Sequence, residues 1–198
     1  MRDQRDHHRE QSLVFVESER VFCRLPREEE AETILQYYEK NQAHFSPWDP
    51  ERPEEFYTQS FWLDYIKRAR NEFRADKTLR FCVFLKEGRE LIGHANFVNF
   101  ERGPFQNCRV GYSIGKDHEG KGLMSEALQI CIHYLFETLD FHRVEANCIP
   151  ENRRSRTLLE KLGFSEHGIA KNYLKINGSW RDHVLTSITK ENWDSHLK

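Results

Sequence analysis

The chain has 198 residues, of which 38% are hydrophobic and 31% are charged, a composition typical of a globular domain with one full core. Its 30 basic and 32 acidic residues give a formal net charge of −2, which argues against direct binding to nucleic acid. No stretch reaches the roughly 18 to 20 apolar residues that a membrane span needs. The polar segment 1–12 lacks the apolar run of a secretory signal. We therefore expect a cytoplasmic protein, monomeric or homodimeric, that does not bind membranes.

The cysteines and histidines do not form the pattern of a metal site. The cysteines are odd in number and widely spaced, with no C-x-x-C pair, which favours reduced thiols over a disulfide framework or a zinc site. The ten histidines are scattered and include no H-E-x-x-H. We therefore expect no bound metal. The five cysteines are Cys23, Cys82, Cys108, Cys131 and Cys148.

The N-terminal half is predicted to be mainly helical. Segment 1–18 is expected to be a flexible leader, because its charged first residues cannot bury apolar surface. A short strand over 19–25 ends at Pro26, which also suits the first turn of a helix that runs to about Lys40. Three prolines then force a loop, and apolar residues at helical spacing predict a second helix over 54–73.

The C-terminal half is predicted to alternate strands with two helices. The expected strands cover 79–86, 91–100, 109–114 and 142–149, followed by two strands around Asn177-Gly178, a strong hairpin signal. The expected helices are a long amphipathic one that begins near Gly120 and a short one that ends near Leu162. This order predicts a single α/β domain over 19–190, followed by a tail over 191–198. Its centre would be a twisted mixed sheet of about seven strands with helices on both faces.

Gly120-Lys121-Gly122 joins a strand end to the long helix. Backbone N–H groups at a helix start lack partners and lie at the positive end of the helix dipole. Two glycines there let a phosphate approach those amides closely. The alternative is a flexible turn before a buried helix. The spacing does not match a dinucleotide G-x-G-x-x-G, because Ser125 takes the third glycine position, and it does not match a P-loop.

Several stretches together resemble the coenzyme A core of the GNAT acetyltransferase family. They are residues 113–124, Asn152-x-x-Ser155 and Leu162-Gly163-Phe164. Within that family the chain resembles the RimJ/RimL ribosomal-protein N-terminal acetyltransferases, especially over 111–115, 120–124 and 178–186, and the similarity extends over about 19–189. The resemblance implies an acetyltransferase that uses acetyl-coenzyme A as cosubstrate, with no metal.

The resemblance also implies the residues that hold coenzyme A. The pantetheine arm would pair with the strand before the turn, and Asn152 would help to hold it. One departure stands three residues before the first glycine, where the family usually has Arg or Gln and this chain has Asp117, whose carboxylate would repel phosphate slightly. The amides implied for the pyrophosphate are those of Glu119, Gly120, Lys121, Gly122, Leu123 and Met124, and the strand implied for pantetheine is Tyr112, Ser113 and Ile114.

Ser155 is the candidate for the acid that protonates the departing thiolate. Many relatives use a Tyr seven residues after the Asn, but Leu159 stands there in this chain, so the resemblance leaves Ser155 with the role. A free thiol has a pKa of about 8.5, so the leaving group needs only modest help. The alternative for Asn152 is simple capping of the helix that it begins.

The base is not identified by the sequence. Some relatives carry a Glu five residues before the Asn, where this chain has Asn147, which cannot accept a proton. Glu145 lies on the same strand face, with pairing to a nearby Arg as the alternative. A weak base favours an α-amine acceptor, with a pKa of about 7.7–8.0, over a Lys side chain at about 10.4.

The acceptor is expected to be the N-terminal alanine of a ribosomal protein. The alternatives on the same fold are an aminoglycoside, a peptide antibiotic, a polyamine or an amino acid. A protein that assists ribosome assembly or regulation and merely holds coenzyme A is the alternative of another class. Phe45, Pro47 and Trp48 in one loop and Trp180 in the hairpin are candidate walls of an acceptor groove.

Two further alternatives concern basic residues and cysteines. The short helix carries Arg153, Arg154, Arg156 and Lys161, which form either a solvated basic face or contacts to the coenzyme 3′-phosphate or an acidic partner. A covalent acetyl-cysteine on Cys108 or Cys148 is weighed against buried structural thiols, with direct attack of the amine favoured.

Overall fold

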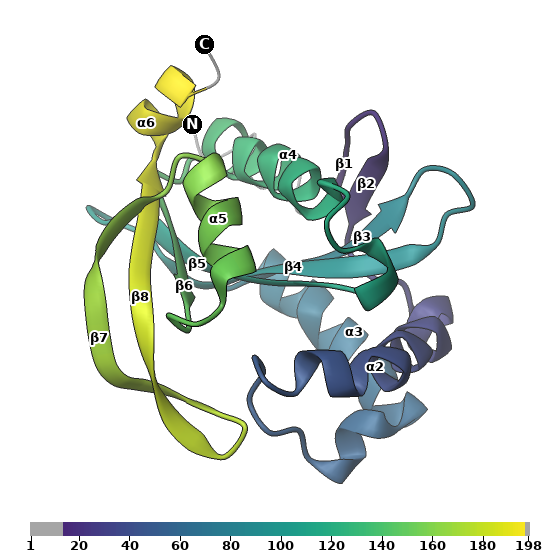
Figure 1. The fold of residues 1–198 in the computed structure, drawn as a ribbon. Helices are drawn as coiled ribbons and strands as arrows, with labels where there is room; N and C mark the ends of the chain where they lie inside the picture. Colours follow the sequence, from purple (N-terminus) through teal and green to yellow (C-terminus); the bar gives the residue numbers. More distant parts are fainter. Residues whose placement is uncertain (1–13, 197–198) are drawn as a thin grey trace.

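An eight-stranded sheet in the order β1-β2-β3-β4-β5-β6-β8-β7 organises the molecule, with helices on both of its faces (Figure 1). The computed structural model describes residues 14–196, so segment 1–12 lies outside the described residues. The predicted mixed α/β architecture is confirmed, with eight strands in place of about seven. In chain order the elements are β1 (Phe15–Glu17), β2 (Val21–Arg24), η1 (Glu28–Glu30), α2 (Ala31–Phe45), η2 (Glu54–Tyr57), α3 (Gln59–Arg74), β3 (Leu79–Leu85), β4 (Leu91–Glu101), β5 (Asn107–Ile114), η3 (Lys116–His118), α4 (Leu123–Glu137), β6 (Arg143–Cys148), α5 (Arg153–Lys161), β7 (Ser165–Ile176), β8 (Ser179–Thr189) and α6 (Lys190–His196).

The eighth strand lies in the segment expected to be a leader. Strand β1 pairs with β2, and the ring of Phe15 stacks on Phe22 with centroids 5.5 Å apart. Val14 is buried in the core beneath the sheet. The prediction of a flexible leader over 1–18 is therefore wrong from residue 14 onward. The apolar residues that begin there pack against the sheet.

The C-terminal segment is also folded, where a tail was expected. Helix α6 spans Lys190–His196 and buries the ring of Trp193 completely. That ring lies against Phe136 of α4, with centroids 6.2 Å apart. Burial of one large aromatic side chain on this scale contributes about 1.5–3 kcal/mol, which is enough to fix one turn of an otherwise polar segment.

The two faces of the sheet have separate cores. Helices α2 and α3 cover the strands β2 to β4 on one face, where Ile34, Trp62 and Phe84 are buried together. Helices α4 and α5 cover the other face, with Leu128, Ile132 and Leu159 among its buried residues (Figure 1). Helix α2 continues to Phe45, beyond the predicted end at Lys40, because Asn41 and Phe45 are both buried on its inner side.

Strands β5 and β6 form the parallel pair of an otherwise antiparallel sheet. Residues Asn107–Arg109 of β5 pair with Arg143–Glu145 of β6, and the pairing ends there. Strand β5 continues to Ile114 and β6 to Cys148. Beyond these paired residues the two strands therefore separate. Ligands in α/β proteins commonly bind where neighbouring strands separate at their carboxyl ends.

The β7–β8 hairpin turns at the predicted dipeptide. Asn177 and Gly178 have φ angles of 44° and 78°, the positive values that a two-residue hairpin turn requires. The hairpin curves toward the loop between α2 and η2 (Figure 1), where the Asn177 amide donates to the Asp49 carbonyl over 3.0 Å. This contact joins the two halves of the chain beside the point where β5 and β6 separate.

Candidate active site

A cavity of about 550 Å³ opens where β5 and β6 separate. Its walls come from the second half of β5, the end of β6, the start of α5 and the loop that follows α2. Segments from both halves of the chain therefore line the cavity. The predicted residues that line it are Tyr112, Ser113, Ile114, Glu119, Met124, Asn152 and Ser155.

The turn before α4 presents free backbone amides next to this cavity. Gly120 and Gly122 have φ angles of 72° and 76°, which favour glycine, and a side-chain carbon at Gly120 would meet no atom within 4 Å. Among the described residues, no acceptor bonds the amides of residues 120–125. Gly120, Lys121, Gly122 and Leu123 do not line the cavity itself, and the side chains of Leu123 and Met124 are buried. This turn can offer N–H groups to an anion, but few side chains.

Arg20, in the turn between β1 and β2, contacts the turn before α4. Its guanidinium donates to the Lys121 carbonyl over 3.1 Å and to Glu126 of α4 over 2.7 Å. Glu126 also accepts from the Arg20 amide (2.8 Å) and from the Ser18 hydroxyl (2.7 Å). Burial tends to raise the pKa of Glu126, but these hydrogen bonds and the positive charge outweigh it and lower that pKa below its ordinary value. The carboxylate therefore stabilises the start of α4 in its charged form.

We expect Glu126→Gln to lower the free energy of unfolding at neutral pH and to lose this effect in acid. A carboxyl whose pKa is lowered by folding contributes stability above its unfolded pKa of about 4.3, and that stability disappears as the pH falls through the folded value. Urea unfolding of both proteins at several pH values measures the difference. Glu39→Gln is the control, because Glu39 is exposed and forms no ion pair with another described residue. A deficit of the same size at every pH would contradict this role.

Two acidic residues near the turn are neutralised by neighbouring cations. Asp117 forms an ion pair with Lys40 over 2.8 Å, which lowers the pKa of its carboxyl. Its repulsion of phosphate is therefore smaller than the sequence suggests. Glu119 forms an ion pair with Arg154, and the Nε2 of His44 lies 3.3 Å from its carboxylate. The helices α2 and α5 thus meet through Glu119 at the edge of the cavity.

Ser155 lies beside a partly buried tyrosine. The hydroxyl oxygens of Ser155 and Tyr112 are 2.7 Å apart, and burial raises the pKa of Tyr112. Asn152 caps α5, because its side-chain oxygen accepts from the Ser155 amide over 3.1 Å. Leu159 is 2% exposed and packs into the core, so its position presents nothing to the cavity. Tyr112 and Ser155 both line the cavity, so the pair can present a hydroxyl donor to it.

Some of the predicted groove walls and basic residues line the cavity, and others lie on the surface. Phe45 and Trp48 line the cavity, whereas Trp180 is 62% exposed and does not, so the predicted role of Trp180 as a wall is wrong. Arg153 and Arg154 also line the cavity, and Arg156 instead pairs with Glu166 over 3.1 Å.

The chain is similar to known proteins along most of its length. Residues 20–165 match the family described as "Acetyltransferase (GNAT) domain". The chain belongs to the GNAT acetyltransferase family. It is 41% identical over 180 residues to the [ribosomal protein uS5]-alanine N-acetyltransferase of Escherichia coli, an alignment that covers 91% of this chain and 93% of that protein.

Solved GNAT structures have the same fold as this chain. The ribosomal-protein-S5-alanine acetyltransferase of Vibrio fischeri superposes with a TM-score of 0.86 at 36% identity, covering 91% of this chain and 98% of that one. RimJ of Mycobacterium smegmatis, in complex with CoA-disulfide, gives 0.83 at 28% identity, covering 90% and 87%. The chain is an N-acetyltransferase that uses acetyl-coenzyme A. Within the described residues no group of three metal-ligating side chains is found.

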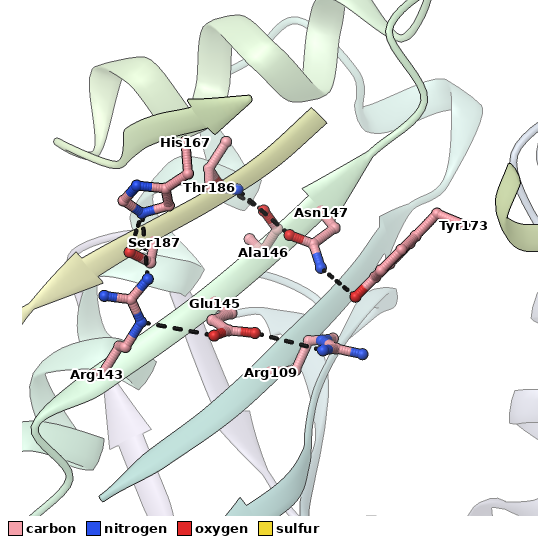
Figure 2. A network of polar contacts seen from close by, with 9 residues as sticks. All are labelled: Arg109, Arg143, Glu145, Ala146, Asn147, His167, Tyr173, Thr186 and Ser187. Atoms are coloured by element: carbon pink, nitrogen blue, oxygen red, sulfur yellow. Dashed lines mark hydrogen bonds and ion pairs between the residues drawn. The ribbon is translucent and has the colours of Figure 1, made fainter. Parts of the chain in front are cut away.

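Neither strand residue considered as the base of this GNAT enzyme is free to accept a proton. Asn147 lines the cavity, but its oxygen accepts from the Thr186 amide over 3.3 Å and its nitrogen donates to the Tyr173 hydroxyl over 3.1 Å (Figure 2). Glu145 does not line the cavity and lies between Arg109 (3.4 Å) and Arg143 (3.6 Å). Glu145 therefore forms structural ion pairs with arginines, which was the alternative to a role as the base.

The two cysteines considered as acetyl carriers are poor nucleophiles in this fold. Cys108 is completely buried in the core, and burial raises the pKa of its thiol. Cys148 lines the cavity but is 6% exposed, and burial raises its pKa as well. Because the thiolate is the reacting form, this arrangement favours direct attack of the amine on the thioester.

Other cavity residues of this GNAT enzyme carry no signal in the sequence. His183 and Asn96 stand in strands, and Tyr38 and Arg52 come from the helical half of the chain. No local motif marks any of them. The pairing of β4 with β5 and of β6 with β8, the packing of α2 on β4, and the contact of the hairpin with the loop after α2 bring them together.

Proposed function

We propose that this enzyme acetylates the N-terminal α-amine of a ribosomal protein, with alanine as the first residue. The observation that carries the proposal is the similarity to the Escherichia coli uS5-alanine N-acetyltransferase along nearly the whole of both chains. The reaction takes place in the cytoplasm, as the five free cysteines favour.

In this proposal coenzyme A lies across the separated strands. Its pyrophosphate accepts hydrogen bonds from the free amides of the turn at 120–124, next to Glu119. Its pantetheine arm pairs with β5 at Tyr112, Ser113 and Ile114, opposite Asn152. What supports this placement is the combination of unpaired amides, two glycines with positive φ and a cavity that begins at the same turn.

The chemistry is direct transfer. The amine lone pair attacks the thioester carbonyl carbon, a C–N bond forms and the C–S bond breaks. The thiolate then takes a proton from the Ser155 hydroxyl, whose oxygen lies 2.7 Å from that of Tyr112, and Ser155 regains a proton from the nitrogen as the amide forms. Holding amine and thioester together supplies much of the acceleration.

The test of the acceptor is a competition between two peptides of otherwise equal sequence. One has a free N-terminal alanine and no Lys, and the other is blocked at its N-terminus and carries one Lys. We expect acetylation of the free N-terminus, because an α-amine with a pKa of about 8 is partly neutral near pH 7, whereas a Lys amine is almost wholly charged. Acetylation mainly of the Lys peptide, or only of an added aminoglycoside or polyamine, would overturn the proposed acceptor. Binding of coenzyme A without any transfer would indicate a binding protein instead.

A further inference from the structure

The amine that attacks the thioester must lose a proton, so the cavity needs a proton acceptor. Its three carboxylates already have cationic partners. Glu119 pairs with Arg154, Asp49 pairs with Arg52 over 2.8 Å, and Glu151 pairs with Arg181 over 3.4 Å. A carboxylate held by a cation is a weaker base, because the positive charge favours its ionised form.

His183 on β8 is different from these carboxylates. It lines the cavity and is 3% exposed. Its Nδ1 lies 3.1 Å from the Arg181 carbonyl oxygen. A carbonyl oxygen can only accept a hydrogen bond, so Nδ1 carries the proton and Nε2 keeps its lone pair. Among the described residues, His183 forms no ion pair with a carboxylate.

The strand pairing places His183 beside the end of β6 that lines the cavity. Val184 pairs with Cys148 and Leu185 with Asn147 across β8 and β6. His183 is two residues from Leu185 and therefore shares the face of the sheet that carries Asn147.

Tyr173 of β7 contacts both Asn147 and His183. The Tyr173 hydroxyl accepts from the Asn147 side chain over 3.1 Å (Figure 2), and its ring lies 5.4 Å from the His183 ring. Tyr173 thus packs against the imidazole and fixes the amide beside it. The network leaves both polar atoms of the Asn147 side chain hydrogen-bonded and leaves a free lone pair on the imidazole.

We propose that Nε2 of His183 is the general base of this acetyltransferase. Near pH 7 the bound α-amine is largely ammonium, and Nε2 first takes one of its protons, which frees the lone pair for attack on the carbonyl carbon. As the C–N bond forms and the C–S bond breaks, Ser155 gives its proton to the thiolate and takes back the second proton that leaves the nitrogen. The imidazolium returns the first proton to water after the amide product leaves. The proposal rests on transfer to an amine, whichever amine that is.

The activity test compares His183→Gln with His142→Gln. His142 is an exposed histidine outside the cavity, where it pairs with Glu191 over 3.1 Å. We expect His183→Gln to lower kcat/KM by about 100-fold near pH 7, within the range for a lost general base. The deficit should shrink toward about pH 9, because the α-amine is then neutral without help. His142→Gln should match the wild type, and the coenzyme Kd from calorimetry should be unchanged in both.

The pH profile must be assigned against the other groups of the cavity. A residue with only a structural role would give a deficit that is constant with pH, or would weaken coenzyme binding. Either result would overturn the proposal, as would wild-type kcat/KM in His183→Gln. The titratable or charged groups that line the cavity with His183 are Tyr38, His44, Asp49, Arg52, Tyr112, Glu119, Cys148, Glu151, Arg153 and Arg154, and Tyr173 packs on the ring.

A second measurement does not depend on activity or on a variant that folds. Nitrogen NMR of the wild-type imidazole, above the pH at which it becomes neutral, reports which ring nitrogen carries the proton. We expect Nδ1–H, and an Nε2–H tautomer would overturn the assignment. If the wild type fails to acetylate the N-terminal peptide, the proposed acceptor is wrong. The same comparison of variants is then made with the amine that it does acetylate, so the two claims fail separately.

Discussion

Gly122→Asp is expected to weaken coenzyme A binding about 100-fold, which corresponds to about 2.8 kcal/mol. The substitution places a carboxylate beside the free amides proposed for the pyrophosphate. Two unit charges 4 Å apart interact by about 1 kcal/mol in water and about 4 kcal/mol near a protein surface, so repulsion of this size follows. A side-chain carbon at Gly122 would meet only the Arg20 guanidinium, at 3.5 Å. The fold should therefore accept the change, and calorimetry with coenzyme A measures the loss.

Gly103→Asp is the matched control for the backbone strain of that variant. Gly103 has a φ of 75°, nearly the same as Gly122, and a side-chain carbon there would meet no atom within 4 Å. It lies in the loop between β4 and β5, outside the cavity. We expect Gly103→Asp to bind coenzyme A normally. Equal affinities for both variants would remove the turn from the coenzyme site.

Ser155→Ala is expected to lower kcat about 100-fold, the lower end of the range for an acid in the transition state. The coenzyme Kd should be almost unchanged, because an interaction made only in the transition state does not contribute to ground-state binding. Steady-state kinetics together with calorimetry separate the two quantities.

Two further variants locate the effect of Ser155. Thr157→Ala changes an exposed hydroxyl on the same helix and should leave kcat unchanged. Tyr112→Phe removes the hydroxyl 2.7 Å from Ser155 and should give a smaller loss than Ser155→Ala. A kcat for Ser155→Ala equal to that of the wild type would mean that water or another group protonates the thiolate.

The order of strands and helices could be predicted because the chain has strong local signals. Asn177-Gly178 takes the positive φ values of a hairpin turn, and the apolar face of residues 123–135 forms a buried helix. The prediction was wrong for residues 14–18 and 191–196, because single buried residues such as Val14 and Trp193 fold segments that are otherwise polar.

The candidate site could be predicted only where its residues adjoin one another in sequence. The amides of the turn at 120–124, and the Asn152 and Ser155 pair at the start of α5, follow from local spacing. His183 and Tyr173 could not be found in this way, because they reach Asn147 through the pairing of three strands. The sequence could not exclude Trp180 from the cavity either, because the alternating pattern of a strand does not show which of its two faces is directed toward the cavity.

The acceptor is tested most directly on ribosomes from a strain that lacks this gene. These are incubated with the purified enzyme and isotopically labelled acetyl-coenzyme A, and tandem mass spectrometry then locates the label. Our account predicts label on the N-terminal α-amine of one ribosomal protein whose first residue is alanine. Label on Lys side chains, or no labelled ribosomal protein while a small amine is acetylated, would contradict it.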